Sequence, residues 1–98
     1  MKEYIDPFTY GFPSIDLHGE DKIGAITKVD ELINDCLRIK SYDIIIVHGK
    51  GSGVLKNAIH EYLKHDKRVE SFKLDNFNDG STIVRLKENI WKRKMVLR

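Results

Sequence analysis

The stretch IIIVHGKGSGVLKNAIHEYL, residues 44–63, joins two kinds of secondary structure through glycine. Its first four residues are all β-branched, which is typical of a strand covered on both faces or lying in a parallel sheet. Three glycines alternate with a lysine and a serine in residues 49–53, and the apolar residues that follow recur with helical spacing. We therefore predict a buried strand, a glycine-rich loop and an amphipathic helix over residues 54–65.

A second His-Gly pair occurs nearer the N-terminus. Residues 14–18 alternate between apolar and polar side chains, so we predict a strand in which Asp16 and His18 share a face. Apolar residues at three- and four-residue spacing then predict a helix over residues 21–40. The two predicted parallel strands thus end in the same dipeptide, which begins at His18 in the first strand and at His48 in the second.

The remaining pattern predicts a β-hairpin. Residues 69–74 and 81–87 alternate as strands do, and residues 76–80 are rich in the turn formers Asn, Asp and Gly. The element order is therefore β-α-β-α-β-β, and right-handed crossovers make the start of the sheet parallel. We predict a two-layer α/β sandwich, in which a four-stranded mixed sheet carries two helices on one face.

Length and composition indicate one domain. The 98 residues divide into an N-terminal arm (1–13), a domain (14–87) and a basic C-terminal segment (88–98). No apolar run approaches the ~20 residues of a membrane helix, no signal peptide is recognisable, and the lone Cys36 has no internal disulfide partner. We therefore expect a cytoplasmic protein without membrane contact, of undefined oligomeric state.

Charge is unevenly distributed along the chain. Residues 85–98 carry a net charge of +5, whereas the rest of the chain carries −3. A basic end on a slightly acidic body favours a polyanionic partner, although a solvated helix or tail explains the same charge. Arg85 is predicted to extend the binding surface for such a partner.

The glycine loop is suited to bind an anion, because backbone N–H groups can approach a ligand closely where no Cβ intervenes. The loop contains neither a Walker A pattern nor the dinucleotide-binding GxGxxG pattern. A glycine-bent junction without any ligand is the alternative interpretation. Because ligands gather beyond the carboxyl ends of parallel strands, we favour a binding site. The predicted phosphate- or nucleic-acid-binding residues are Gly49, Lys50, Gly51, Ser52, Gly53, Lys56 and Arg85.

Together, IDLHGE at residues 15–20 and HGKGSG at residues 48–53 resemble the two signatures of the Smr (small MutS-related) domain. The resemblance covers about residues 14–87 and implies a fold similar to the C-terminal domain of translation initiation factor three. It also implies nucleic-acid binding, with nicking or endonuclease activity reported across many members. No ATPase or clamp domain precedes the motifs, so the chain is similar to a stand-alone Smr protein.

The resemblance places the family's proposed active positions at Asp16 and His18, and its glycine-loop positions from His48 onward. Histidines can exchange protons near neutral pH, so we predict Asp16, His18 and His48 as catalytic residues. The alternative is that each imidazole ties down a neighbouring backbone group. Asp16 could orient His18 or hold a divalent cation such as Mg²⁺, but one carboxylate does not define a metal site and none is predicted.

Some residues depart from the family pattern or receive no firm role. The family often has a second glycine-rich segment before the last strand, of which this chain keeps only Gly80, followed by Thr82. Tyr62 or Trp91 could stack on a base, although packing is the preferred interpretation for Trp91. His60 receives no role, and neither does His65, because their five-residue spacing does not place them on one helix face.

Three functions stay open at this point. The chain could cleave or nick DNA or RNA through the predicted catalytic residues. It could instead be a non-catalytic module that binds structured nucleic acid or a ribosome-associated RNA through the same loop. A third alternative is that the loop holds a small phosphorylated metabolite.

Overall fold

The sequence patterns produce six elements in the computed structural model, which describes residues 11–88. They are β1 (Ser14–Asp16), α1 (Lys22–Arg38), β2 (Asp43–Val47), α2 (Val54–Lys64), β3 (Val69–Asp75) and β4 (Asn78–Leu86). The predicted order β-α-β-α-β-β is confirmed. Nearly all of the predicted N-terminal arm and basic C-terminal segment, Trp91 included, lies outside the described residues.

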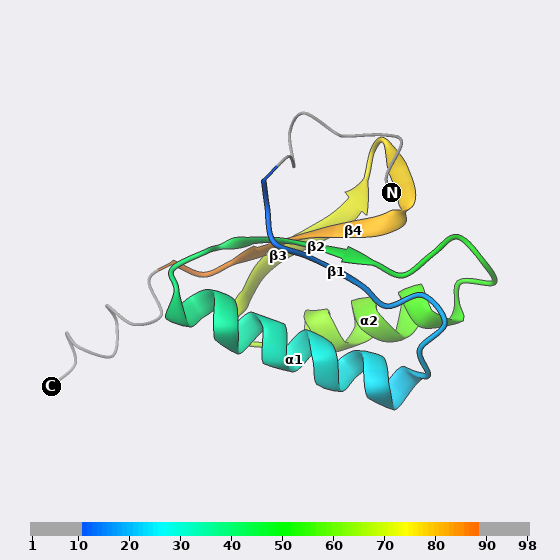
Figure 1. The fold of residues 1–98 in the computed structure, drawn as a ribbon, viewed down its shortest axis with the longest axis horizontal. Coiled ribbons are helices and arrows are strands. Elements are labelled where there is room, and N and C mark those ends of the chain that lie inside the picture. The colour runs from blue at the N-terminus through cyan, green and yellow to red at the C-terminus, as the bar shows by residue number, and fades with distance from the viewer. Residues whose placement is uncertain (1–10, 89–98) are drawn as a thin grey trace, which may run out of the picture.

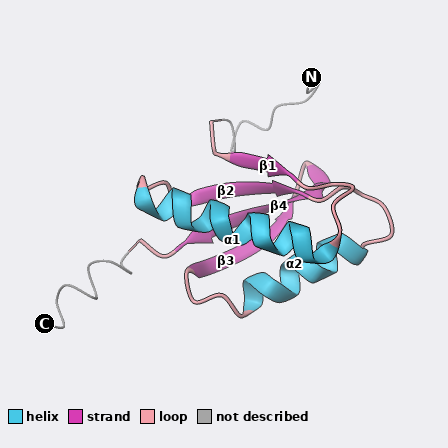
Figure 2. Ribbon diagram, turned by 60° about the horizontal axis from the view of Figure 1, so that its bottom comes forward, coloured by secondary structure: helices cyan, strands magenta, loops and turns pink. Residues whose placement is uncertain are grey.

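The strands form one mixed sheet in the order β1-β2-β4-β3. β1 runs parallel to β2, and β4 is inserted antiparallel between β2 and β3. Both helices cover the same face of this sheet (Figures 1 and 2). The predicted two-layer sandwich is therefore confirmed, and the parallel pair β1–β2 ends at one edge of the sheet.

Alternation along β2 separates the two faces of the sheet. Ile44 and Ile46 are fully buried under the helices, whereas Ile45 and Val47 are half-buried on the other face. Burial of these side chains and of the helix stripes supplies the main favourable free energy of folding. The buried apolar residues are Leu17, Ala25, Val29, Ile33, Cys36, Leu37, Ile44, Ile46, Ile59, Leu63, Val69, Val84 and Leu86.

The two helices begin in different ways. Asp21 caps α1, because its Oδ1 accepts from Gly24 N at 2.7 Å. The N-cap residue of α2 is Gly53, which lies in the left-handed region with φ 90° and has no side chain to act as a cap. The N-cap residue of α2 therefore offers no side-chain hydrogen bond to the first backbone N–H groups, whereas Asp21 does so for α1.

Two boundaries differ from the predicted ones for local reasons. α1 ends at Arg38, because Lys40 takes a left-handed φ of 61° and its N–H donates to Leu37 O at 3.1 Å. β4 begins at Asn78 instead of residue 81, because Asn78 pairs with Asp75 beyond an irregularity in the register of β3. The hairpin connection is therefore shorter than the turn-forming residues predict.

Arg68, between α2 and β3, joins both helices through its guanidinium group. Its Nη2 donates to Asp66 Oδ2 at 2.6 Å and to Asp30 Oδ1 of α1 at 2.7 Å. The same nitrogen lies 3.1 Å from the Tyr62 hydroxyl, and Nη1 donates to Asn34 at 2.7 Å. Burial raises the pKa of Tyr62 to about 12, with the Asp66 carboxylate adding to the effect. This network fixes α1, α2 and the start of β3 relative to one another.

Candidate functional site

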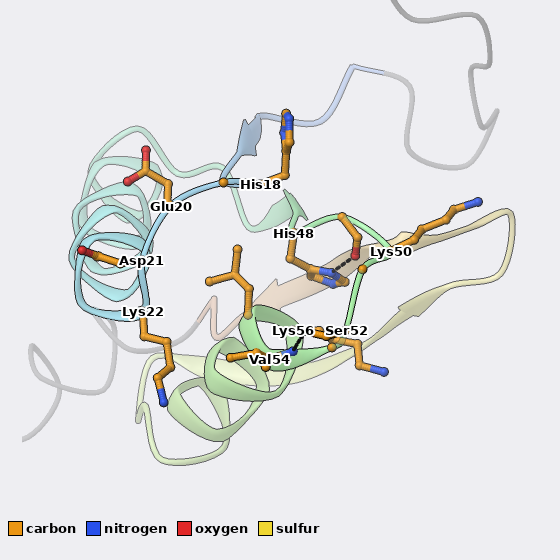
Figure 3. A pocket seen from close by; sticks show the side chains of 14 residues that line it. His18, Glu20, Asp21, Lys22, His48, Lys50, Ser52, Val54 and Lys56 are labelled. Atoms are coloured by element: carbon orange, nitrogen blue, oxygen red, sulfur yellow. Dashed lines mark hydrogen bonds between the residues drawn. The ribbon is translucent and has the colours of Figure 1, made fainter.

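The parallel strands β1 and β2 bring their ends to one cleft. Leu17 N donates to Val47 O at 2.7 Å, so the two chains stay paired up to their His-Gly dipeptides. A cleft of about 600 Å³ lies beyond them, lined by residues 18–22 and 48–56 (Figure 3). The structure therefore brings the two strand ends together, as the sequence pattern predicts.

Asp16 and His18 form a pair on the face of the sheet that the helices leave open. Asp16 Oδ1 accepts from His18 Nδ1 at 2.7 Å and from His18 N at 3.1 Å, and Leu17 between them is buried in the core. Because a carboxylate oxygen only accepts, Nδ1 carries the proton of the neutral ring. Nε2 then carries no proton and is able to accept one. The side chains of His18 and Asp16 are 70% and 58% exposed.

The hydrogen bond between these side chains shifts both of their pKa values. It raises the pKa of His18 above 6.5 and lowers the pKa of Asp16 below 3.8. The stabilising effect of the pair is therefore fully present between pH 3.8 and pH 6.5, the ordinary pKa values of the two groups. It is lost as pH rises through the raised pKa of His18, and as pH falls through the lowered pKa of Asp16.

Asp16→Asn should return the pKa of His18 toward 6.5, because the neighbouring negative charge is removed. An NMR titration of the His18 ring protons measures this change. His48 provides an internal control: its ring lies on the opposite face of the sheet, so its pKa should stay the same in both proteins. An unchanged His18 pKa in Asp16→Asn would contradict the pairing.

His48 points to the other side of the sheet, toward α2 (Figure 3). It continues the buried alternation of β2 and is only 5% exposed. Its Nδ1 donates to Gly49 O at 3.1 Å, and its Nε2 lies 2.7 Å from Thr82 Oγ1. Both ring nitrogens are engaged by the protein, so His48 ties down its neighbouring backbone, as the alternative interpretation holds. Its predicted catalytic role stays a prediction that this geometry does not favour.

The glycine loop lines the cleft between β2 and α2. It leaves β2 at Gly49 with φ 87° and enters α2 at Gly53 with φ 90°. Ser52 Oγ accepts from Val54 N at 3.4 Å, a long hydrogen bond. Because the first residues of α2 line the cleft, the positive end of the α2 dipole faces it, an arrangement that attracts anions.

Two lysines flank this loop. Lys56 lines the cleft from the first turn of α2. Lys50 also lines it, and its Nζ lies 3.5 Å from Asp79 Oδ1 in an exposed ion pair. Such pairs contribute little to stability, so the Lys50 side chain can exchange Asp79 for another anion at small cost.

Gly49→Ala should lower the free energy of unfolding by about 1–2 kcal/mol, because a left-handed φ strains any residue with a Cβ. The added Cβ would also lie 3.3 Å from His18 Cβ. Gly51→Ala is the matched control: its Cβ would meet no atom within 4 Å and its φ is not positive. Urea denaturation of both variants tests this. An equal loss in Gly51→Ala would contradict the prediction.

The β3–β4 hairpin contacts the start of the glycine loop through residues of β4. Gly80 O accepts from both His48 N and Gly49 N at 2.9 Å, and Thr82 on β4 holds the His48 ring. The two residues that remain of the family's second glycine-rich segment, Gly80 and Thr82, thus both contact the loop region. His60 on α2 also reaches Thr82 Oγ1, at 2.6 Å, a contact that the sequence analysis missed.

Other predicted residues lie away from the cleft. Arg85 pairs in register with Asp43, at the end of β2 opposite to the loop, and donates to Asp43 Oδ2 at 2.7 Å and to Glu88. The structure does not bring Arg85 together with the loop, and its contact with nucleic acid stays a prediction. Tyr62 belongs to the network around Arg68 at the other end of α2.

The donor set for a protein-held cation is absent from residues 11–88, where no three His, Cys, Asp or Glu side chains converge. The Oδ1 atom of Asp16, a carboxylate that could hold a divalent cation, is hydrogen-bonded to His18. We therefore assign no step to a metal ion. Within the same residues, neither helix has the length and apolar character needed to cross a membrane.

The fold and the cleft together define a small α/β domain whose main cleft in the described residues lies at the junction of its second strand and second helix. The family model for the Smr domain matches residues 15–87. This chain belongs to the Smr domain family.

Relatives agree with this assignment. Endonuclease MutS2 of Clostridium acetobutylicum is 41% identical over 75 residues, which are 76% of this chain and 10% of that protein. Endonuclease MutS2 of Symbiobacterium thermophilum is 38% identical over 79 residues, again covering 10% of the relative. The chain thus spans only about a tenth of the curated relatives that it matches.

Two solved structures share the fold. The Smr domain of Thermus thermophilus MutS2 superposes with a TM-score of 0.74 and 35% identity, covering 76% of this chain and 98% of that one. YdaL, a stand-alone small MutS-related protein from Escherichia coli, also gives a TM-score of 0.74, at 16% identity. That match covers 88% of this chain and 79% of YdaL. The YdaL comparison supports the fold alone.

Proposed function

We propose that this Smr domain binds the sugar–phosphate backbone of DNA or RNA and cleaves it. One observation carries the proposal: the glycine loop, the start of α2 and His18 line one cleft, and the His18 ring is hydrogen-bonded to the exposed Asp16. The relatives named Endonuclease MutS2 support a nuclease-type function. The names of these relatives describe much longer proteins, so the activity of this chain needs its own test.

In the proposed complex, a phosphate group occupies the cleft at the start of α2. Its oxygens accept hydrogen bonds from backbone N–H groups of the loop, and Lys50 and Lys56 offset its charge. Lys50 exchanges Asp79 for the phosphate. This binding requires no particular base, so it is independent of sequence.

In the proposed reaction, His18 Nε2 removes a proton from the attacking oxygen, supplied by water or by a ribose hydroxyl. The attacking oxygen forms a bond to phosphorus, and the bond from phosphorus to the leaving oxygen breaks. The leaving oxygen takes a proton from solvent. Asp16 holds the His18 ring by Nδ1 and stabilises the imidazolium that forms. Because Asp16 raises the pKa of His18, cleavage should increase as pH rises through that value.

Binding should weaken with salt, since lysines that neutralise phosphates release counterions. Two phosphate contacts predict an affinity loss of about tenfold between 50 and 200 mM salt on duplex DNA. Lys56→Gln should lower the slope of log affinity against log salt by about one. Fluorescence anisotropy with labelled duplex, branched DNA and RNA, with and without magnesium, measures both effects. Salt-independent binding would contradict the proposal, and competition by mononucleotides but not by oligonucleotides would favour a small phosphorylated ligand.

A non-catalytic binding module for structured nucleic acid or ribosome-associated RNA is the second candidate. Both ring nitrogens of His48 are hydrogen-bonded within the protein, which leaves His18 as the one strand-end histidine able to accept a proton from a substrate. This favours the binding module. In this case, substitutions at the loop alter affinity while no cleavage product forms at any protein concentration.

A further inference from the structure

A cluster of three polar side chains lies between the sheet and α2, behind the glycine loop. Thr82 Oγ1 lies 2.7 Å from His48 Nε2 and 2.6 Å from His60 Nε2. The His48 and His60 rings meet edge to face with centroids 5.9 Å apart, and the Phe72 ring lies 4.9 Å from His60. Both imidazoles are thus held in place by packing as well as by the shared hydroxyl.

The partners of each nitrogen determine the direction of the hydrogen bonds. The Gly49 carbonyl can only accept, so Nδ1 carries the proton of the His48 ring. Burial lowers the pKa of His48, so the ring is neutral near pH 7 and Nε2 is bare. The single hydroxyl proton of Thr82 is therefore donated to His48, and the Thr82 oxygen accepts from His60 Nε2–H. This relay runs from His60 through Thr82 and His48 to the Gly49 carbonyl.

We propose that His60 is a positioning residue for the glycine loop, acting through the Thr82 hydroxyl on His48 and thereby on the Gly49 carbonyl. The Gly49 N–H is held independently by Gly80 O at 2.9 Å. Because the carbonyl and the N–H of Gly49 are both hydrogen-bonded, the loop leaves β2 in one orientation. The importance of that orientation for ligand binding rests on the proposed function, whereas the relay is a property of the unbound protein.

Histidine tautomers in the unbound protein test the relay directly. Long-range ¹H–¹⁵N correlation spectra near neutral pH should show His48 protonated at Nδ1 and His60 protonated at Nε2. Thr82→Val removes the donor to His48 Nε2 and should shift that resonance and mix the tautomers, whereas Thr82→Ser should preserve the pattern. A His48 ring protonated at Nε2 in the parent protein overturns the proposal.

Oligonucleotide affinity tests the consequence for the loop. His60→Leu should weaken binding about three- to tenfold, the range expected for one neutral hydrogen bond. His60→Gln, which offers an N–H near the position of Nε2, should stay within about twofold of the parent. His65→Gln is the matched control, because His65 ends the same helix and is exposed. Parental affinity and an unchanged His48 spectrum in folded His60→Leu overturn the proposal.

Two further outcomes have defined meanings. If His60→Leu does not fold, Thr82→Ser and Thr82→Val make the same comparison, and equal affinities for those two variants overturn the proposal. If the parent binds no nucleic acid while its spectra show the relay, the nucleic-acid function fails and the relay is upheld. Because the spectra need no ligand, the two failures are distinguishable.

Discussion

His18→Ala and Asp16→Asn should each slow cleavage of nucleic acid by about 100-fold or more, the contribution expected of a positioned general base. In the proposed reaction, His18→Ala removes the nitrogen that takes the proton, and Asp16→Asn removes the charge that orients the ring and stabilises its protonated form. Single-turnover cleavage of a labelled substrate measures the rate. Affinity should change little, because the loop and the start of α2 are untouched.

His65→Gln serves again as the control, because it removes a histidine on a different part of the surface. Its cleavage rate should equal that of the parent. Equal rates in His18→Ala, Asp16→Asn and the parent would refute the assigned roles and point to a contaminating nuclease. A loss of affinity that parallels the loss of rate would instead assign His18 to phosphate binding.

Arg68→Met should lower the free energy of unfolding by about 2–4 kcal/mol, because it leaves a buried carboxylate without its positive partner. Asp66 is the group concerned: its side chain is 5% exposed, and two of its hydrogen bonds come from the Arg68 guanidinium. Burial opposes ionisation of Asp66, but the hydrogen bonds from Arg68 outweigh it and lower the pKa of Asp66. Urea denaturation at neutral pH measures the loss.

Arg38→Met is the matched substitution for this test. Arg38 pairs with Asp35 at 2.7 Å on the exposed face of α1, and such pairs contribute at most about 1 kcal/mol. The loss of unfolding free energy in Arg68→Met should also become smaller as pH falls, because a protonated Asp66 carries no buried charge for the guanidinium to neutralise. Equal losses in the two variants would show that the buried network adds nothing beyond a surface ion pair.

Much of the site was predictable because its signals are local. The β-branched residues before His48, the glycines after it and the second His-Gly pair at His18 are each visible in a few consecutive residues. Alternation also predicts that Asp16 and His18 share a face, and their 2.7 Å hydrogen bond agrees. These features depend on the pleat of a single strand and on the general position of parallel strand ends.

What the sequence could not predict depends on strand register and packing between distant segments. His48 and His18 end neighbouring strands, but only the pairing of Asp16 with Val47 shows that their side chains point to opposite faces. The contact between His60 and Thr82 spans 22 residues of sequence. Arg85 carries a charge that suits nucleic acid, yet its register with Asp43 places it far from the loop.

The position of β4 has a consequence for the order of synthesis. β4 is the last strand of the domain to leave the ribosome, yet it lies inside the sheet between β2 and β3. It also carries Gly80 and Thr82, which anchor the backbone and ring of His48. A nascent chain that stops after β3 contains the glycine loop but lacks the Gly80 and Thr82 contacts that hold His48 and Gly49. The loop region therefore reaches its final geometry only after β4 has paired with β2 and β3.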